Sequence, residues 1–312
     1  MLPVLVLAGP TGAGKTDWAI RAAESAPLEI VSVDSALVYR GLDVGTAKPA
    51  REVRARIPHH LIDICDAAES YSAGRFAADA LRAIRDIHAR QRVPLLVGGT
   101  MLYLRALLEG LATLPAASAQ LRSELDARAA ALGWPALHAE LARLDPQAAA
   151  RIAANDGQRV QRALEVCYTT GEPISKLQRA TVSPLAGFSV RYWILCPRDR
   201  EVLKQRIALR FDSMMAAGFL DEVRRLRDRG DLTAAQPSMR AVGYRQLWAH
   251  LDGECGLEEA GRRAVAATRQ LAKRQLTWMR GERRAAWLDP AAQASWIRDI
   301  CHELAAIGLP AT

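Results

Sequence analysis

Short apolar runs alternate with longer helical stretches through the first hundred residues of this 312-residue chain. The runs Val4–Ala8, Glu29–Val33 and Pro94–Val97 are short and mainly apolar, as buried strands are. Between them, stretches such as Asp17–Ala26 and Ala73–Arg90 have the composition and spacing of helices. This alternation predicts an α/β fold, in which helices cover both faces of a parallel sheet and ligands bind at the carboxyl ends of the strands.

After about residue 115 the pattern becomes purely helical. The predicted helices are Ala119–Leu132, Pro135–Leu144, Pro146–Ala153 and Asp156–Thr170, with Ser118 and Asn155 as N-caps of the first and last, which end at Gly133 and Gly171. Strand patterns return at Tyr192–Pro197 and Ala286–Leu288. We therefore expect an all-helical insertion domain, residues 115–190, between a first part of the α/β core, residues 1–114, and a second part, residues 191–312.

The first predicted strand runs directly into a complete phosphate-binding motif, G-x-x-x-x-G-K-[ST]. Its residues are Gly9, Pro10, Thr11, Gly12, Ala13, Gly14, Lys15 and Thr16. Glycines let backbone N–H groups converge on an anion at a helix N-terminus, Lys15 can reach a terminal phosphate, and the Thr16 hydroxyl can ligate Mg²⁺. The motif predicts a P-loop NTPase-like core that binds a di- or triphosphate. It does not decide whether the phosphate is transferred, hydrolysed or expelled.

Two further segments come after predicted strands and therefore belong to the same edge of the sheet. Asp34 comes after the second strand and is a candidate general base; a turn or N-cap aspartate and a partner of Mg²⁺ are the alternatives. Gly98-Gly99-Thr100 comes after the third strand, where many P-loop hydrolases carry an acid. The glycines permit close backbone approach, and Thr100 can donate to a phosphate oxygen without adding negative charge. This favours a departing pyrophosphate over water activation.

The charge distribution points to a second, larger anion. The net charge is +8 and the pI about 9.6, and residues 193–312 hold 20 basic against 15 acidic side chains. A long helix is predicted from Leu257 to Arg280; its apolar stripe is Val265, Ala272, Leu276 and Met279, and its basic stripe Arg262, Arg269, Lys273 and Arg280. From Arg269 to Arg284 there are six basic residues and one acid, so ion pairs within the helix cannot explain the stripe. We favour phosphate contact over a solvated face.

Several classes of protein fit the sequence poorly. The N-terminus lacks the features of a signal peptide, and no apolar stretch is long enough to span a membrane, so we expect a cytoplasmic protein without membrane association. Five scattered cysteines, without C-x-x-C spacing, argue against a disulfide framework or zinc site. His59 and His60 lack metal-ligand partners at suitable spacing.

Several sequence blocks together carry a specific resemblance. They are the P-loop motif, Ser32-Val33-Asp34-Ser35-Ala36-Leu37-Val38-Tyr39-Arg40, Asp43-Val44-Gly45-Thr46-Ala47-Lys48-Pro49, Pro58-His59-His60-Leu61-Ile62-Asp63, Val97-Gly98-Gly99-Thr100-Met101-Leu102-Tyr103, Val242-Gly243-Tyr244-Arg245-Gln246 and Thr268-Arg269-Gln270-Leu271-Ala272-Lys273-Arg274-Gln275. In this order, and up to about Asp289, they resemble the bacterial tRNA dimethylallyltransferases, also called tRNA isopentenyltransferases or the IPP transferase family. One departure is Ala36-Leu37, where many members carry Met-Gln; a side-chain amide contact to the base is lost there.

The resemblance implies an enzyme that transfers a dimethylallyl group from dimethylallyl diphosphate to N6 of the adenine 3′ of the anticodon, with Mg²⁺ assisting and diphosphate leaving. It assigns Asp34 as the base, places Thr100 between pyrophosphate and adenine, and gives the diphosphate to the P-loop and Arg210. The implied contacts to the tRNA anticodon stem-loop are Asp34, Ser35, Ala36, Leu37, Thr100, Arg122, Gln158, Arg159, Val160, Gln161, Arg162, Arg240, Ala241, Val242, Gly243, Tyr244, Arg245, Lys273, Arg274, Gln275, Leu276, Thr277, Trp278, Met279 and Arg280. We expect a monomer.

Two other functions are compatible with the P-loop. A kinase of nucleosides or small metabolites would bind ATP there and use Asp34 as the base for a hydroxyl acceptor, but it leaves the insertion and the basic helix without a role. A non-enzymatic RNA-binding NTPase switch would need a nucleotide-sensing acid after Val97, and the sequence has none there. The sequence does not exclude ATP from the P-loop.

Overall fold

The computed structural model describes residues 1–112, 114–115, 118–178 and 181–309. The chain forms two compact units: unit 1 comprises residues 1–108 and 184–312, and unit 2 comprises residues 109–183. The expected insertion, residues 115–190, begins and ends several residues later than unit 2. Helix α4 (Met101–Leu108) ends where unit 2 begins, and Ser189 already belongs to a strand of unit 1. The sequence pattern therefore changes several residues after each boundary between the units.

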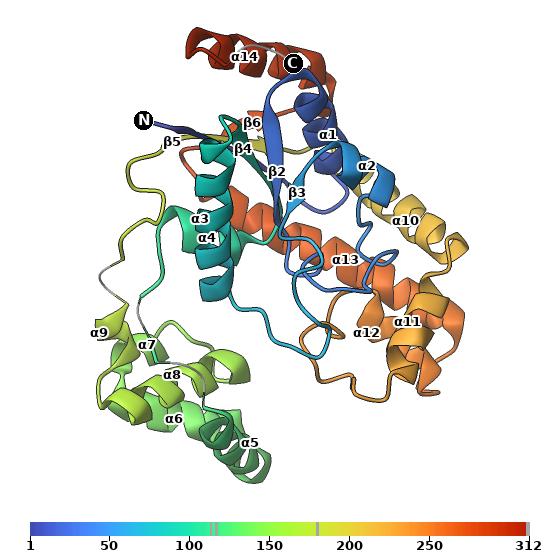
Figure 1. Ribbon diagram of the computed structural model, residues 1–312. Helices are drawn as coiled ribbons and strands as arrows, with labels where there is room; N and C mark the ends of the chain where they lie inside the picture. Colours follow the sequence, from blue (N-terminus) through green and yellow to red (C-terminus); the bar gives the residue numbers. More distant parts are fainter. Residues whose placement is uncertain (113, 116–117, 179–180, 310–312) are drawn as a thin grey trace. The chain divides into compact units, whose positions relative to one another are not determined.

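Unit 1 contains a parallel sheet of six strands in the order β3-β2-β4-β1-β5-β6 (Figure 1). The strands are β1 (Pro3–Ala8), β2 (Leu28–Val33), β3 (His59–His60), β4 (Val93–Gly98), β5 (Ser189–Leu195) and β6 (Ala286–Leu288). The predicted parallel sheet is confirmed. Of the strands, β3 has two residues and left no pattern to recognise, and β5 starts and ends earlier than the run Tyr192–Pro197.

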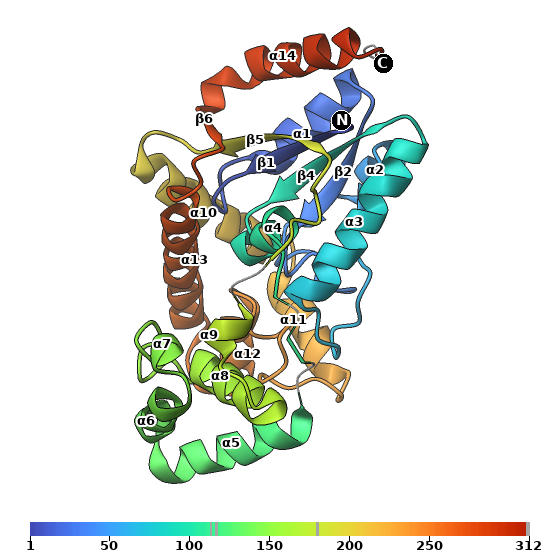
Figure 2. The same cartoon turned by 90° about the vertical axis from the view of Figure 1, so that its left-hand side faces the viewer.

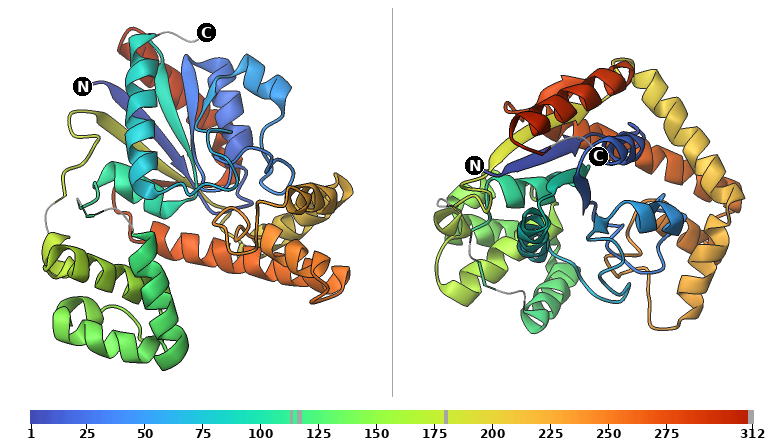
Figure 3. Two further views of the ribbon diagram at one scale, coloured as in Figure 1. Left: turned by 60° about the horizontal axis from the view of Figure 1, so that its bottom comes forward. Right: turned by 45° about the horizontal axis from the view of Figure 1, so that its top comes forward.

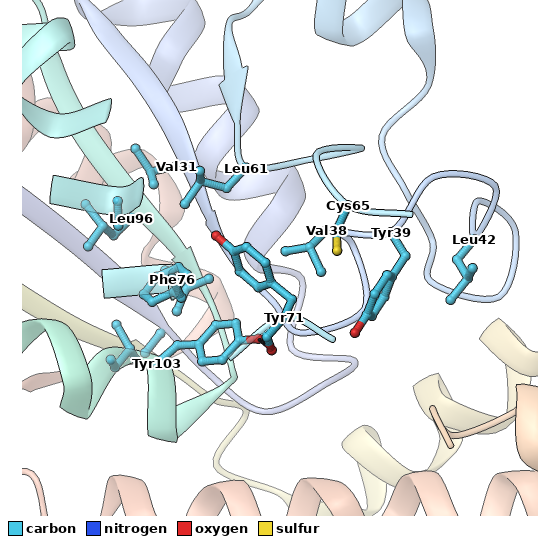
Figure 4. Packing of buried hydrophobic residues seen from close by; sticks show 14 of the residues in the cluster. Val31, Val38, Tyr39, Leu42, Leu61, Cys65, Tyr71, Phe76, Leu96 and Tyr103 are labelled. Atoms are coloured by element: carbon cyan, nitrogen blue, oxygen red, sulfur yellow. Dashed lines mark hydrogen bonds between the residues drawn. The ribbon is translucent and has the colours of Figure 1, made fainter. Parts of the chain in front are cut away.

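Helices cover both faces of this sheet, and successive residues of a strand enter different cores. In β1, Val4 and Val6 face one core while Leu5 and Leu7 face the other. The first core lies under α3 (Ala73–Ala89) and α4; there Phe76 stacks on Tyr103 at 4.4 Å between ring centroids (Figure 4). The second lies under α1 (Lys15–Ser25) and α14 (Gln293–Ala306). Burial on both faces explains the near-continuous apolar runs.

The remaining helices of unit 1 gather at the edge of the sheet where the strands end. They are α10 (Arg200–Ala216), α11 (Phe219–Asp228), α12 (Tyr244–Leu251) and α13 (Leu257–Met279), with the short 3₁₀ helix η1 (Pro290–Ala292) after β6. Helix α2 (Arg51–Arg56) instead precedes β3, and its Arg56 pairs with Glu24 near the end of α1 at 3.5 Å. Helix α13 packs against α10, α12 and α4 (Figure 2). Helices α11 and α12 lie near the end of α13 at which that helix begins (Figure 3). Helix α13 confirms the long helix that was predicted from Leu257 to Arg280.

Unit 2 is a cluster of helices with its own core. The helices are α5 (Ala119–Leu132), α6 (Trp134–Leu144), α7 (Pro146–Ala149), α8 (Gly157–Thr170) and α9 (Ile174–Leu177). The Ser118 hydroxyl caps α5 as predicted, accepting from the Leu121 N–H at 3.2 Å. The predicted cap of α8 was wrong: the Asp156 carboxylate, and not Asn155, accepts from the Arg159 N–H at 3.3 Å. Helix α7 also ends before the predicted Ala153.

Candidate active site

The carboxyl edge of the sheet brings the predicted phosphate loop and the candidate base together. In the sheet register, Gly98 of β4 lies opposite both Ala8 of β1 and Val33 of β2. The residues after these three strands therefore start at one level, with the β4 turn between the P-loop and Asp34. The sequence anticipated this neighbourhood from strand order alone.

The two glycines after β4 are required by protein packing. A Cβ on Gly98 would lie 2.0 Å from the carbonyl oxygen of Val33. A Cβ on Gly99 would lie 2.5 Å from Nε2 of Gln275 and 2.8 Å from the carbonyl oxygen of Gly9. We expected close backbone approach at these positions, and the neighbours that come close are the adjoining strand ends and helix α13.

Two partly buried cations converge on the P-loop. The Lys15 ammonium donates to the Pro10 carbonyl at 2.9 Å, and the Arg210 guanidinium donates to the Thr11 hydroxyl at 2.5 Å. Burial lowers the pKa of Lys15 from its ordinary 10.5 to about 8; nearby Asp34 opposes this shift, and Arg210 adds to it. Burial also lowers the pKa of Arg210, again opposed by Asp34. Both cations would be better solvated beside a bound anion, which makes this an anion site.

The Asp34 carboxylate has one oxygen engaged and one free. Its Oδ1 accepts hydrogen bonds from the N–H groups of Ala36 at 2.8 Å and Leu37 at 3.3 Å. Its Oδ2 has no hydrogen-bond partner within the described part of the chain. The turn role and the base role are therefore compatible: one oxygen fixes the carboxylate, and the other can accept a proton.

Thr100 fixes the segment that carries Asp34. Its hydroxyl oxygen accepts from the Ser35 N–H at 3.0 Å, and its own N–H donates to the Val33 carbonyl at 3.2 Å. The Ser35 hydroxyl lies 3.4 Å from the same oxygen. Thr100 thus ties the end of β2 to the end of β4. A hydrogen bond from Thr100 to a phosphate oxygen stays a prediction.

A cavity of about 510 Å³ opens between these groups and helices α10 to α13. Its polar wall includes Thr11, Lys15, Thr16, Asp34, Ser35, Thr100, Arg210, Arg240, Arg274 and Gln275. Its apolar wall includes Met101, Leu102, Ile207, Phe211, Met214, Phe219, Leu271 and Trp278. Apart from Trp278, sequence reasoning missed this apolar wall, because its residues look like ordinary core positions of amphipathic helices. The cavity can hold a molecule that is anionic at one end and apolar elsewhere.

A buried carboxylate organises the far part of the cavity wall. Glu222, 3% exposed, accepts from the N–H groups of Asp43 at 2.9 Å, Val44 at 2.7 Å and Gly45 at 3.0 Å. The Tyr244 hydroxyl donates to it at 2.6 Å. Burial and the Glu222 carboxylate raise the pKa of Tyr244 well above its ordinary value, which keeps the phenol protonated.

Phe219 packs into the space that two glycines leave open. A Cβ on Gly45 would lie 2.0 Å from the Phe219 ring, and one on Gly243 would lie 2.8 Å from it. The ring also meets Tyr244 edge-on at 4.9 Å between centroids. Tyr244 is fully buried and holds Phe219 and Glu222 in place at the cavity wall; its implied RNA contact stays a prediction.

The structure narrows the basic stripe of α13. Arg262 precedes the acid-poor segment Arg269–Arg284 and forms ion pairs with Glu258 and Glu259, so within the predicted stripe its charge is already neutralised. Arg269, Lys273, Arg274 and Arg280 are exposed and form no ion pair with any carboxylate of the described residues. Trp278 is 44% exposed, and the Arg105 guanidinium lies 5.9 Å from its ring centroid. The Leu276 and Met279 side chains are buried against neighbouring elements, and their implied RNA contacts stay a prediction.

A family model settles the relationship of this chain to known proteins. The model described as IPP transferase matches residues 37–282. The chain belongs to the IPP transferase family. It is 59% identical over 282 residues to a tRNA dimethylallyltransferase of Bordetella petrii, with 90% of each chain covered. The predicted family resemblance is confirmed.

Solved structures of the family agree with the fold. The tRNA isopentenylpyrophosphate transferase of Bacillus halodurans is 36% identical, with a TM-score of 0.71 and 98% of each chain covered. A eukaryotic dimethylallyltransferase acting on tRNA is 28% identical, with a TM-score of 0.80 over 99% of this chain and 81% of that one. The P-loop NTPase-like architecture predicted for the core is the fold of these IPP transferases.

The implied RNA contacts in unit 2 of this IPP transferase differ in how exposed their side chains are. Val160 is fully buried in the helical core and cannot reach a ligand by its side chain. Arg122 and Arg162 are partly exposed and pair with the buried Glu165, Arg162 at 2.7 Å. Gln161 donates to Asp126 at 2.7 Å. Gln158 and Arg159 are exposed. Arg122 and Arg162 could bind a phosphate without losing Glu165 as a partner.

Proposed function

We propose that this chain transfers a dimethylallyl group from dimethylallyl diphosphate to N6 of the adenine 3′ of the anticodon in tRNA, with release of diphosphate. One observation carries the proposal: the partly buried cations Lys15 and Arg210, an Asp34 oxygen without a hydrogen-bond partner among the described residues, and an apolar wall line the same cavity. The relatives named tRNA dimethylallyltransferase support the choice of reaction. We propose that it acts in the cytoplasm, where tRNA is.

The P-loop end of the cavity would bind the diphosphate. Lys15, Arg210 and the P-loop N–H groups provide positive charge where the leaving group gains negative charge as the C–O bond breaks. The Thr16 hydroxyl also lines the cavity and is a suitable oxygen ligand for Mg²⁺, which usually binds through substrate phosphates and few protein groups. When bound, Mg²⁺ supplies further neutralisation of the diphosphate.

Asp34 would take the proton from the attacking amine. An exocyclic adenine amine is a poor nucleophile, because its lone pair is delocalised into the ring. As the new C–N bond forms to the allylic carbon, the amine loses a proton to Oδ2 of Asp34, and the electron pair of the C–O bond leaves with the diphosphate. General-base assistance of this kind contributes typically about 10²–10⁴ in rate.

The apolar wall would protect the reacting carbon from water. The allylic carbon acquires cationic character in the transition state, so water in the cavity would convert the donor to an alcohol. Phe211 and Met214, which follow Arg210 on α10, line the cavity, as does Phe219 at the start of α11. These side chains offer the dimethylallyl group an environment from which water is excluded.

The exposed basic residues of α13 would bind the RNA. Arg269, Lys273 and Arg274 present guanidinium or ammonium groups that are free to pair with phosphates. The half-exposed Trp278 ring and Leu102 line the cavity, where a base that leaves the loop stack could be received.

A transfer assay tests this function against the kinase alternative. The full-length protein is incubated with Mg²⁺, unmodified tRNA and dimethylallyl diphosphate labelled in the dimethylallyl group, without ATP. We expect label in the tRNA and one free diphosphate for each group transferred. Absence of label in the tRNA, together with phosphoryl transfer from γ-labelled ATP to a nucleoside or metabolite, would establish the kinase instead.

A further inference from the structure

Gln275 joins the two loops that form the phosphate end of the cavity. Its side-chain oxygen accepts a hydrogen bond from the Thr11 N–H at 2.9 Å, and its side-chain nitrogen donates to the Gly99 carbonyl at 2.9 Å. The first partner belongs to the P-loop and the second to the turn after β4. One amide on α13 therefore holds both loops in a fixed relation.

The surrounding backbone is shaped to receive this amide. A Cβ on Gly99 would lie 2.5 Å from Nε2 of Gln275, so a larger residue would expel the side chain from its place. Gln275 is partly buried and lines the cavity, whereas its neighbours Lys273 and Arg274 are exposed. Its two hydrogen bonds point toward the loops, so each end of the amide already has one backbone partner.

Thr11 forms hydrogen bonds with both Gln275 and Arg210. The Thr11 N–H is held by Gln275, while the Thr11 hydroxyl accepts from Arg210 at 2.5 Å. Moving the backbone at Thr11 would therefore displace both the P-loop amides and the contact that fixes the Arg210 guanidinium. An anion site depends on such fixed donors, because donors that must reorganise on binding lose part of their stabilisation.

We propose that Gln275 is a positioning residue for the diphosphate and not an RNA contact. The inference rests on the proposed function insofar as the diphosphate is the substrate's leaving group. It differs from the role that the family resemblance gives to the α13 segment as a whole. An amide suits this position because it offers an acceptor on one side and a donor on the other.

The first test compares two substitutions of glutamine by methionine on the same helix. Gln275→Met keeps the size of the side chain and removes both hydrogen bonds; Gln270→Met is the matched control at an exposed position. The dissociation constants of inorganic pyrophosphate with Mg²⁺ and of unmodified tRNA are measured by calorimetry and by filter binding. For Gln275→Met we expect pyrophosphate to bind about tenfold more weakly, since two hydrogen bonds that order the site are lost. Affinity for tRNA and its salt dependence should equal those of the control.

Two results would overturn the assignment. Weaker tRNA binding with a changed salt dependence and unchanged pyrophosphate affinity would make Gln275 an RNA contact. A lowered melting temperature with both affinities unchanged would leave it a purely structural residue. Failure of the unaltered protein to bind pyrophosphate would count against the proposed function itself, so the two failures are distinguishable.

Gln275→Glu provides a test by pH. Its ionised carboxylate can accept from the Thr11 N–H but would repel the Gly99 carbonyl, whereas the protonated acid restores a donor on that side. The ratio of pyrophosphate dissociation constants, Gln275→Glu over unaltered protein, should therefore fall as pH is lowered from about 8 to about 5.5, through the range where a carboxyl group near a carbonyl is protonated. A ratio that does not change with pH would show that the donor to Gly99 has no part in binding.

Discussion

The Tyr244 hydroxyl donates a 2.6 Å hydrogen bond to the buried carboxylate of Glu222, which already accepts from three consecutive backbone N–H groups at residues 43–45. Four donors thus converge on one anion, and none of them belongs to a cationic side chain. This arrangement joins α11, α12 and the loop after β2 behind the cavity wall. We expect its removal to lower the free energy of unfolding first, and to weaken ligand binding as a consequence.

Tyr244→Phe should destabilise the protein by about 1–3 kcal/mol, because a buried carboxylate loses one donor without gaining a solvent contact. Urea unfolding followed by circular dichroism measures this change, with the midpoint expected to fall at unchanged m-value. Tyr168→Phe is the control, because it removes a phenol hydroxyl that also donates to a carboxylate, that of Glu140, but at a residue that is 39% exposed. Equal midpoints for Tyr244→Phe and the unaltered protein would mean that the Glu222 cluster adds little to stability.

Asp34→Asn should reduce transfer by about 10²–10⁴ while leaving tRNA affinity nearly unchanged, because it removes the proton acceptor and keeps an oxygen for the Ala36 and Leu37 N–H groups. Asp34→Asn is a more specific test than Asp34→Ala, because alanine would also remove the hydrogen bonds to the Ala36 and Leu37 N–H groups. Single-turnover transfer with saturating dimethylallyl diphosphate gives the rate, and filter binding gives the affinity. A normal rate would remove Asp34 as the base.

Diphosphate binding should weaken as pH rises through about 8, the pKa of Lys15 in the free protein. Free Lys15 loses its proton there, whereas Lys15 beside a diphosphate keeps it, so binding at higher pH takes up a proton and becomes less favourable. Calorimetry with pyrophosphate measures this slope. Lys15→Arg should lack it, because arginine stays protonated at every accessible pH. The same slope in both proteins would assign it to another group.

Neutralising Lys273 and Arg280 together should weaken tRNA binding and reduce the slope of log affinity against log salt by about 0.7–0.9 for each lost phosphate contact. The control is Arg262→Gln on the same helix, since Arg262 is already paired with Glu258 and Glu259. Filter binding at several salt concentrations gives both slopes. An unaltered slope for the double variant would show that Lys273 and Arg280 are solvated surface residues and do not contact phosphates.

The parts of the site that could be predicted depend on local sequence. The P-loop motif and Asp34 come directly after apolar strands, and parallel strands bring the segments after them to one edge of the sheet. Glu222 could not be foreseen, because a carboxylate on an amphipathic helix normally faces water, and three of its four donors lie about 180 residues earlier in the chain. The amide of Gln275 was hidden for the same reason, since its partners are backbone groups that carry no signal in the sequence.

The helix caps and the basic stripe show a second limit. Asn155 and Asp156 are both good N-caps, and only the backbone geometry chooses Asp156. Arg262 has the spacing of the basic stripe, but Glu258 and Glu259 in the preceding turn neutralise it, while the residues after Arg269 have no such neighbours. Among the described residues, the stripe lacks ion pairs only where acids are absent from the preceding turn, and phosphate contact there stays a prediction.

The partly buried cations Lys15 and Arg210 also affect the release of the product. Diphosphate that has left its carbon carries more negative charge than the same group in the ester, so the cations that favour bond breaking hold the product more strongly than the donor. An enzyme built in this way is subject to product inhibition. We therefore expect accumulated diphosphate to inhibit transfer, and a pyrophosphatase that removes free diphosphate to relieve this inhibition.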